Sequence, residues 1–284
     1  MIKSYSLRKK LTNAAVYGLL TVLALIWITP IVYLFILSLR KEAGAYTTYL
    51  LPKEYTLHNY KLLFTDTSLF NYPRWYANTF LVAVVSCLIS TIMILMISYA
   101  FSRLRFPSRA KFMNLGLILG MFPGFMSMVA VYHLLKVIGL AQSLFSLVLV
   151  YSASSALGYF VAKGFFDTIP RSLDEAATID GANKNQIFWK IILPLSKPIV
   201  VYTALTSFIA PWADFIFVSV IMKDNYDNFT VALGLYQMLS RENIYRYFTR
   251  FCAGAVLVAI PITLLFMILQ RYYVSGVTGG AVKQ

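Results

Sequence analysis

Charged residues are scarce in this chain, and acidic residues are the scarcest of them. Only 13% of the 284 residues are charged, and Asp and Glu together number 11 against 25 Lys and Arg. Because a soluble domain carries about 25% charged residues, this composition excludes an ordinary soluble protein. With 59% hydrophobic residues and a mean hydropathy of +0.70, the chain has the composition of a membrane protein.

Cysteine and histidine are also rare, with two residues of each. Cys87 and Cys252 lie within or beside apolar runs, and neither has a CxxC or Cys/His spacing. We therefore interpret them as packing residues rather than as a disulfide or a metal site. A membrane enzyme would need several polar groups at one depth, and the sequence does not supply them. We expect no catalytic residue and no metal site.

Apolar runs long enough to cross a membrane occur six times. A hydrocarbon core of about 30 Å requires about 20 helical residues. Lipid offers no hydrogen-bond partner to an open backbone, so each run should be a helix. We predict an all-α fold, a single transmembrane domain over 1–284 with six spanning helices. The predicted spans are 14–39, 76–102, 112–135, 141–162, 199–222 and 251–270.

The distribution of basic residues predicts the orientation of these spans. Placing the N-terminus in the cytoplasm puts fifteen of the 25 Lys and Arg on the inner side, including those of the short loop RLRFPSRAK. Both termini are therefore predicted to be cytoplasmic. The net charge of +14 is spread over many loops, which favours contact with membrane lipid and indicates no nucleic-acid partner.

The segment IPRSLDEAATIDGANKNQIFWKIILPL, residues 169–195, is unusually polar. Four of the 11 acids lie in it or, as Asp167, just before it. Ser172 and Glu175 have the S-x-x-E spacing of a capping box, and Gly181 suits the left-handed position that ends a helix. We predict a short cytoplasmic coupling helix at about 172–181, between the fourth and fifth spans.

A second helical segment should follow the short helix, with apolar residues on one face until prolines break it. The face is formed by Ile187, Phe188, Ile191 and Ile192, and the prolines are Pro194 and Pro198. Ala176 and Ala177 leave the exposed side of the short helix flat, so that the cleft of a partner can approach closely. The alternative is a plain loop, in which Glu175 is only a cap and the alanines only favour helix.

This segment resembles the EAA motif of ABC-importer permeases. The motif reads EAA, x3, G, x9, I-x-L-P. This segment matches it at every fixed position, with Glu175-Ala176-Ala177, Gly181, Ile191 and Leu193-Pro194. The stretches YAFSRLRFPSRAKF, MFPGFMSMVAVYHLL and VSGVTGGAVKQ are similar to MalG-like permeases of maltose and maltodextrin importers. The resemblance runs from about Ile28 to the end of the chain.

The resemblance implies a permease subunit of an ATP-driven, binding-protein-dependent sugar importer in the bacterial cytoplasmic (inner) membrane. This chain would form half of the translocation pathway. Its partners would be a second homologous permease, two ATP-binding subunits and an extracytoplasmic sugar-binding protein. It would bind no cofactor itself, because ATP and Mg are used by the ATP-binding subunits. The sequence contains no G-x-x-x-x-G-K-[ST] nucleotide loop.

The resemblance also implies roles for individual residues. It assigns coupling to the ATPase to Glu175, Ala176, Ala177, Asp180, Gly181, Leu193 and Pro194. Gly279 and Gly280 would lie in an extended tail that reaches the ATPase, with an unpacked flexible end as the alternative.

An outer segment, 223–249, would meet the binding protein, with Tyr236 and Gln237 as candidate contacts. Its Tyr226, Tyr236, Tyr245 and Tyr247 could bind sugar, although tyrosine is also the usual residue of membrane-interface belts.

Asp214 is the one acid inside a predicted span, and it follows Pro211 and Trp212. Acids inside a membrane are costly and are usually functional, so Trp212 and Asp214 are candidates for the translocation pathway. A structural acid at a helix break is the alternative. An ion-gradient-driven secondary transporter is the alternative function, but such carriers usually show internal repeats and several intramembrane acids, and this sequence shows neither.

Overall fold

The computed structural model describes residues 5–121, 124–153 and 156–281. Within these residues the chain is helical, and the one extended pairing is an isolated antiparallel bridge between Arg40 and Tyr55. The predicted all-α fold is confirmed. The chain divides into two compact units, Met1–Phe70 with Gln237–Leu257, and Asn71–Tyr236 with Val258–Gln284.

The first unit contains α1 (Tyr5–Ser38), α2 (His58–Thr65) and the first turns of α14 (Ile244–Ala281). Its interior is partly polar, because the Arg40 side chain is almost fully buried. Asn59 donates hydrogen bonds to the carbonyl oxygens of Ser38 and Arg40 at 2.9 and 2.8 Å. Thr249 in turn donates to Asn59 Oδ1 at 3.1 Å. These bonds connect α2 to the end of α1 and to α14.

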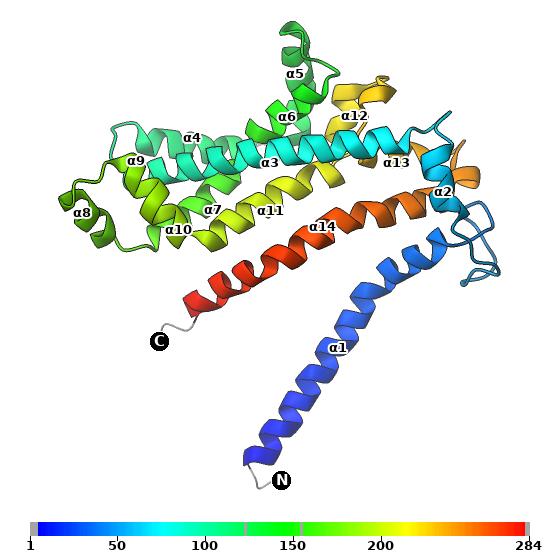
Figure 1. Cartoon of the computed structure of the whole chain (residues 1–284), viewed down its shortest axis with the longest axis horizontal. Helices are drawn as coiled ribbons and strands as arrows, with labels where there is room; N and C mark the ends of the chain where they lie inside the picture. Colours follow the sequence, from blue (N-terminus) through cyan, green and yellow to red (C-terminus); the bar gives the residue numbers. More distant parts are fainter. Residues whose placement is uncertain (1–4, 122–123, 154–155, 282–284) are drawn as a thin grey trace. The chain divides into compact units, whose positions relative to one another are not determined.

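The second unit is organised along one long helix, α3 (Tyr72–Arg103). Three helices pack along it, namely α6 (Leu144–Ala153), α7 (Ala156–Asp167) and α11 (Lys197–Ala213). The short helix α8 (Ser172–Ile179) lies beyond one end of α3 (Figure 1). The other elements are α4 (Arg109–Met121), α5 (Gly124–Val137), α9 (Lys184–Ile187), the π-helix η1 (Phe188–Ile192), α10 (Leu193–Leu195), α12 (Ile216–Met222), the 3-10 helix η2 (Tyr226–Asn228) and most of α13 (Val231–Met238).

Four helical stretches are long and apolar enough to cross a membrane, and two bent pairs of helices would bring the number to six. The four are Leu7–Ser38, Tyr72–Arg103, Leu144–Asp167 and Ile244–Tyr272. One bent pair is Arg109–Met121 with Met126–Val137, at 107°, and the other is Lys184–Leu195 with Lys197–Ala213, at 85°. The predicted third span, 112–135, is thus a bent pair and not one straight helix.

The predicted fifth span, 199–222, is also divided. Helix α11 ends at Ala213, and Asp214 has an extended backbone with φ −87° and ψ 105°. The Asp214 carboxylate accepts a hydrogen bond from the Phe217 N–H at 3.0 Å. This bond satisfies an N–H in the first turn of α12, whose N-cap residue is Phe215, so Asp214 supports a new helix start just after the break.

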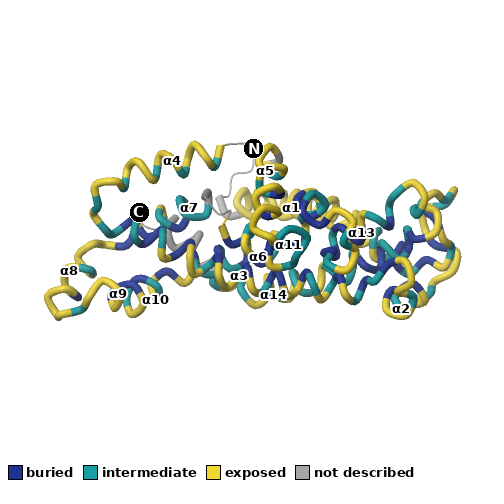
Figure 2. The backbone as a smooth tube through the Cα atoms, turned by 90° about the horizontal axis from the view of Figure 1, so that it is seen from above, coloured by how far each residue is buried: buried dark blue, intermediate teal, exposed yellow. Residues whose placement is uncertain are grey.

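An apolar cluster fills the second unit at the end where α8 lies. Ile187, Phe188 and Ile192 are buried in it together with Tyr99 of α3, and Ile191 packs against it. The predicted apolar face of the second segment is therefore confirmed. Figure 2 shows the contrast with α4 and α8, whose backbones are mostly exposed.

At the opposite end of α3, Gly234 allows α13 to approach Trp75 closely. A Cβ atom placed on Gly234 would lie 1.9 Å from Cε3 of the Trp75 ring. The ring has little room to move, because Trp75 is buried and its indole N–H donates to the Tyr226 carbonyl at 2.8 Å.

We expect Gly234→Ala to destabilise the protein by about 1–3 kcal/mol or more, the range typical of an overpacked core. Thermal unfolding of the purified protein measures this loss. Gly164→Ala is the matched control, because a Cβ there meets no heavy atom within 4 Å. Equal melting temperatures for the two variants would contradict the close packing of α13 on Trp75.

Candidate functional site

Helix α8 occupies the position predicted for the short helix, but it begins differently. Ser172 is its first helical residue, and the N-cap is Arg171, with helical backbone angles and no side-chain capping bond. The N–H groups of Asp174 and Glu175 donate instead to the Arg171 carbonyl at 3.0 and 3.1 Å. A capping side chain needs a non-helical backbone, which Ser172 lacks, so the predicted Ser172–Glu175 capping box is wrong.

The capping box of this region lies at the start of α9. The Asn183 side chain accepts from the Gln186 N–H at 2.9 Å, and the Gln186 side chain accepts from the Asn183 N–H at 2.8 Å. Asn at the cap with Gln three residues later satisfies the same spacing rule. The sequence therefore contains a capping-box spacing at Asn183 and Gln186, whereas the prediction placed the box at the start of α8, the preceding helix.

The end of α8 agrees with the role predicted for Gly181. Gly181 has φ +85°, a conformation that costs glycine little. Its N–H donates to the Thr178 carbonyl at 3.1 Å, and the Ala182 N–H donates to the Ala177 carbonyl at 2.9 Å. This pair of bonds is the Schellman motif, which satisfies carbonyls at the end of a helix.

The two alanines of the motif lie on different faces of α8. Ala176 is exposed, as are Glu175 and Asp180, whereas Ala177 is 8% exposed and belongs to the apolar cluster. The expectation that Ala177 lies on the exposed side is therefore wrong. Neighbouring residues of a helix do not share a face, so Ala177 anchors α8 while Ala176 faces outward.

The exposed face of α8 also carries two large apolar residues that the motif does not include. Leu173 is 39% exposed and Ile179 is 86% exposed. With Ala176 they follow a three-residue spacing, which places them on neighbouring positions of one helix surface. This spacing is the sequence signal by which Leu173 and Ile179 could have been found.

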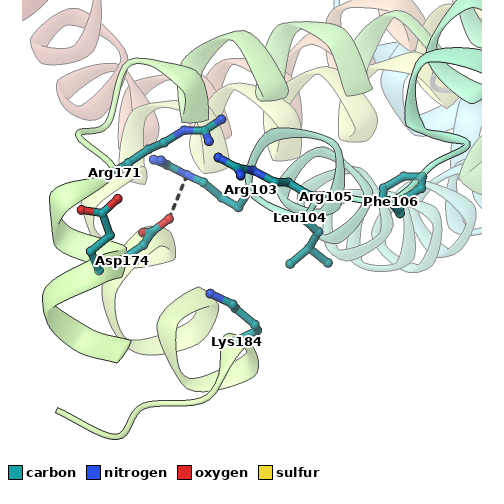
Figure 3. A pocket seen from close by; sticks show the side chains of 8 residues that line it. Arg103, Leu104, Arg105, Phe106, Arg171, Asp174 and Lys184 are labelled. Atoms are coloured by element: carbon teal, nitrogen blue, oxygen red, sulfur yellow. Dashed lines mark ion pairs between the residues drawn. The ribbon is translucent and has the colours of Figure 1, made fainter. Parts of the chain in front are cut away.

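Arg103, at the end of α3, fastens α8 to the bundle. Its Nε lies 3.5 Å from Asp174 Oδ2, with the two side chains 3% and 14% exposed (Figure 3). The same guanidinium donates to the carbonyl oxygens of Phe166 and Ile169, both at 2.8 Å. Arg103 thus joins α3, the end of α7 and α8. In the sequence it is only one of the inner basic residues, although it stands directly at the end of an apolar span.

The segment after α8 ends between the two prolines predicted to break it, Pro194 and Pro198. Pro194 lies inside α10, and the chain turns by 85° only after it, at Ser196. The preceding π-helix η1 closes with a bond from the Leu193 N–H to the Phe188 carbonyl. Proline has no N–H to donate to the turn before it, and the wider π-helical turn accommodates that loss. Leu193 and Pro194 line a pocket of about 330 Å³ with Lys197.

The candidate pathway residues differ in their surroundings. Trp212 is 3% exposed and packs edge-on against Tyr76 at 5.2 Å between ring centroids. Asp214 lines a cavity of about 630 Å³ between α4, α5, α6 and α12. Tyr151, which lines the same cavity, donates from its hydroxyl to Asp214 Oδ2 at 3.0 Å. Asp214 therefore accepts a hydrogen bond from the first turn of α12 and is also a polar group in a cavity.

The tyrosines of the segment 223–249 are not equally accessible. Tyr236 is 52% exposed and stacks on Phe215 with 4.6 Å between ring centroids. Gln237 accepts at its carbonyl from Asn243 at 3.1 Å. Tyr247, by contrast, is 6% exposed and contacts Phe70 at 4.7 Å, so it offers no free face to a ligand.

The tail glycines lie in a helix. Gly279 and Gly280 belong to the helical backbone of α14, which extends to Ala281, where an extended segment was expected. The remaining tail residues, 282–284, lie outside the described part. Among the described residues, no three His, Cys, Asp or Glu side chains come together in a way that could hold a metal ion.

Similarity to known proteins extends over the whole chain. The family described as "Binding-protein-dependent transport system inner membrane component" matches residues 7–279, so the likeness begins well before Ile28. The chain is 33% identical to the galactooligosaccharides transport system permease protein GanQ of Bacillus subtilis, with 100% of both chains covered. It is 35% identical to the maltodextrin transport system permease protein MalD of Streptococcus pneumoniae, again with 100% of both chains covered.

Solved structures show the same fold. A bacterial ABC transporter involved in the import of the acidic polysaccharide alginate matches with a TM-score of 0.76 and 24% identity, over 96% of this chain and 99% of that chain. The inward-facing MetNI methionine ABC transporter matches with a TM-score of 0.55 and 19% identity, over 71% of this chain and 94% of that chain. The family match and the two curated relatives, which are described as transport system permeases, favour a transport permease over an ion-gradient carrier. The chain therefore belongs to the family of inner membrane components of binding-protein-dependent transport systems, as a multi-pass membrane protein.

Proposed function

We propose that this chain is one of two permease subunits of an ATP-driven, binding-protein-dependent importer of oligosaccharides. The relatives described as permeases of maltodextrin and galactooligosaccharide transport systems support this class of sugar. A second permease completes the pathway, two ATP-binding subunits hydrolyse ATP with Mg, and an extracytoplasmic protein delivers the sugar. The chain has no ATPase site of its own, and both of its termini are cytoplasmic.

The observation that carries the proposal is the exposed face of α8. A two-turn helix of eight residues is only about 12 Å long, so it does not cross a membrane. Leu173, Ala176 and Ile179 nevertheless present apolar surface on it, beside the exposed Glu175. Apolar residues presented by a helix in this way suit insertion into a groove of a partner. We infer that this partner is the ATP-binding subunit and that Glu175, Ala176, Asp180 and Gly181 lie at its surface.

The Arg103 contacts suggest how motion passes from α8 to the membrane. A buried guanidinium paired with a carboxylate and two carbonyl oxygens has a fixed geometry. Ala177 adds an apolar anchor on the same side of α8. When ATP binding closes the ATPase pair, α8 moves as part of the α3 bundle, and the pathway switches between inward-facing and outward-facing states.

The remaining candidate residues have supporting roles in this proposal. Asp214 and the buried Trp212 lie beside the translocation pathway. Tyr236 and Gln237 lie at the surface that meets the binding protein. Leu193 and Pro194 shape the turn from the coupling segment into α11. Gly279 and Gly280 lie toward the ATPase as part of the end of α14.

The proposal is tested by reconstituting the chain with its partners and measuring uptake of labelled maltotriose and of a galactooligosaccharide. We expect uptake to require ATP and the binding protein. Glu175→Lys should abolish most uptake, because it reverses the charge beside the docking face, while the permease remains folded in the membrane. Glu54→Lys is the matched control, because Glu54 is exposed in the other unit, lies outside the segment 223–249, and gives the same change of charge when replaced.

Two results would contradict the proposal. Uptake by this chain alone, driven by an ion gradient without ATP, would exclude an ATP-dependent permease. Full uptake and unchanged ATPase association in Glu175→Lys would exclude the docking role of α8.

The Arg103 attachment is tested separately by Asp174→Ala. Removing one partner of a buried ion pair leaves an unpaired charge, and we expect a loss of about 3 kcal/mol in unfolding free energy. The control is Asp227→Ala. Asp227 pairs with Arg74 at 3.1 Å, but the two side chains are 70% and 49% exposed, and an exposed pair contributes less than about 1 kcal/mol. Equal losses in thermal unfolding would show that Asp174 does not hold α8.

A further inference from the structure

A strongly basic pocket lies between the end of α3 and the start of α8 and α9. Its volume is about 580 Å³, and the charged side chains that line it are Arg103, Arg105, Arg171, Lys184, Asp174 and Glu175. Four cations therefore share one pocket with two carboxylates. Figure 3 shows Arg103 and Arg105 from the end of α3 and the loop after it, near Arg171, Asp174 and Lys184 from the segment that contains α8 and the start of α9.

The pocket's own ion pair leaves most of this positive charge uncompensated. Arg103 and Asp174 neutralise each other, and one terminal nitrogen of Arg103 donates to two carbonyl oxygens. Arg171 makes one long bond, 3.4 Å to the Ser102 carbonyl. The side chains of Arg105 and Lys184 make no hydrogen bond or ion pair with any residue in the described part of the chain. Three cations thus face one remaining acid, Glu175.

Cations gathered in one pocket repel each other, and a bound anion removes that cost. The planar guanidinium group of arginine can bind two oxygens of a phosphate through two parallel hydrogen bonds. The ammonium group of lysine adds a positive charge. The chemistry of the lining therefore selects a phosphate ester over a neutral ligand.

The apolar part of the lining indicates where this phosphate comes from. Leu104 and Phe106 line the pocket beside the cations, and they directly follow α3, one of the four helices able to cross a membrane. A basic pocket at the cytoplasmic end of a membrane helix is placed at the depth of lipid headgroups. Apolar and cationic groups side by side suit a ligand that carries a phosphate on an apolar body.

We propose that this pocket binds the phosphate of an anionic phospholipid of the cytoplasmic leaflet. The proposal rests on the proposed function only for the side of the membrane on which α8 lies. Because Asp174 and Glu175 of α8 border the same pocket, the bound headgroup bridges the α3–α4 loop and the coupling helix. The bound lipid then lies beside the coupling helix without being required for transport.

The test is a titration of the assembled transporter with phosphatidylglycerol, followed by native mass spectrometry. Arg105→Gln/Lys184→Gln should weaken retention of the lipid by about fivefold for each cation removed, roughly 25-fold in all. Lys111→Gln/Lys190→Gln is the matched control, because both residues are exposed and neither lines the pocket. We expect this control to retain phosphatidylglycerol as the unchanged protein does, and phosphatidylcholine to bind weakly to all three.

Two outcomes would overturn the proposal. An equal loss in the control pair would mean that lipid follows overall charge and not the pocket. Displacement of the lipid by inorganic phosphate alone at similar concentration would assign the pocket to a free anion. ATP-dependent uptake of maltotriose in phosphatidylcholine vesicles, measured on the same variants, tests the transport function independently, since it should persist whether or not the lipid site exists.

Discussion

The buried contact between Arg103 and Asp174 is the constraint on which the site depends. An arginine at the end of a long apolar helix would ordinarily extend into water, because burying its charge without a partner is costly. Here the side chain is 3% exposed, and the cost is offset by a carboxylate of α8 and two carbonyl oxygens at the end of α7. The position of α8 relative to α3 is therefore fixed by a charge that would otherwise lack compensation.

This arrangement gives the two faces of α8 different tasks. Ala177 is small enough to let the helix lie close to the cluster around Ile187 and Phe188, and it seals one face. Ala176 and Ile179 occupy the other face, which is free to enter a partner. The Schellman motif at Gly181 ends the helix after two turns, so the chain returns into η1 and α11. Helix α8 is short, with one face anchored to the bundle and the other exposed. These properties suit a helix that transmits motion between two proteins.

Features that depend on composition and local backbone chemistry could be predicted from the sequence. The all-α fold, the position of α8, its end at Gly181 and the shared apolar face of Ile187 and Ile192 follow from hydropathy, helical spacing and the freedom of glycine to adopt positive φ. Features that depend on contacts distant in sequence could not. The buried pair of Arg103 with Asp174 joins residues on two separate helices, and the burial of Ala177 depends on the cluster that it meets. The capping box could not be placed from spacing alone, because Ser172 and Asn183 each have a suitable partner three residues later and the backbone conformation decides which one can cap.

The central claim is that α3 and α8 move as one body when ATP binds. Pulsed electron paramagnetic resonance tests it most directly, with spin labels at Thr178 of α8 and Leu88 of α3, both exposed, after Cys87 and Cys252 are replaced by serine. We predict the same distance distribution between the two labels in the assembled transporter with and without ATP. A distance that shifts with ATP while the permease remains folded would contradict the claim, because α8 would then move independently of the helix to which Arg103 fastens it.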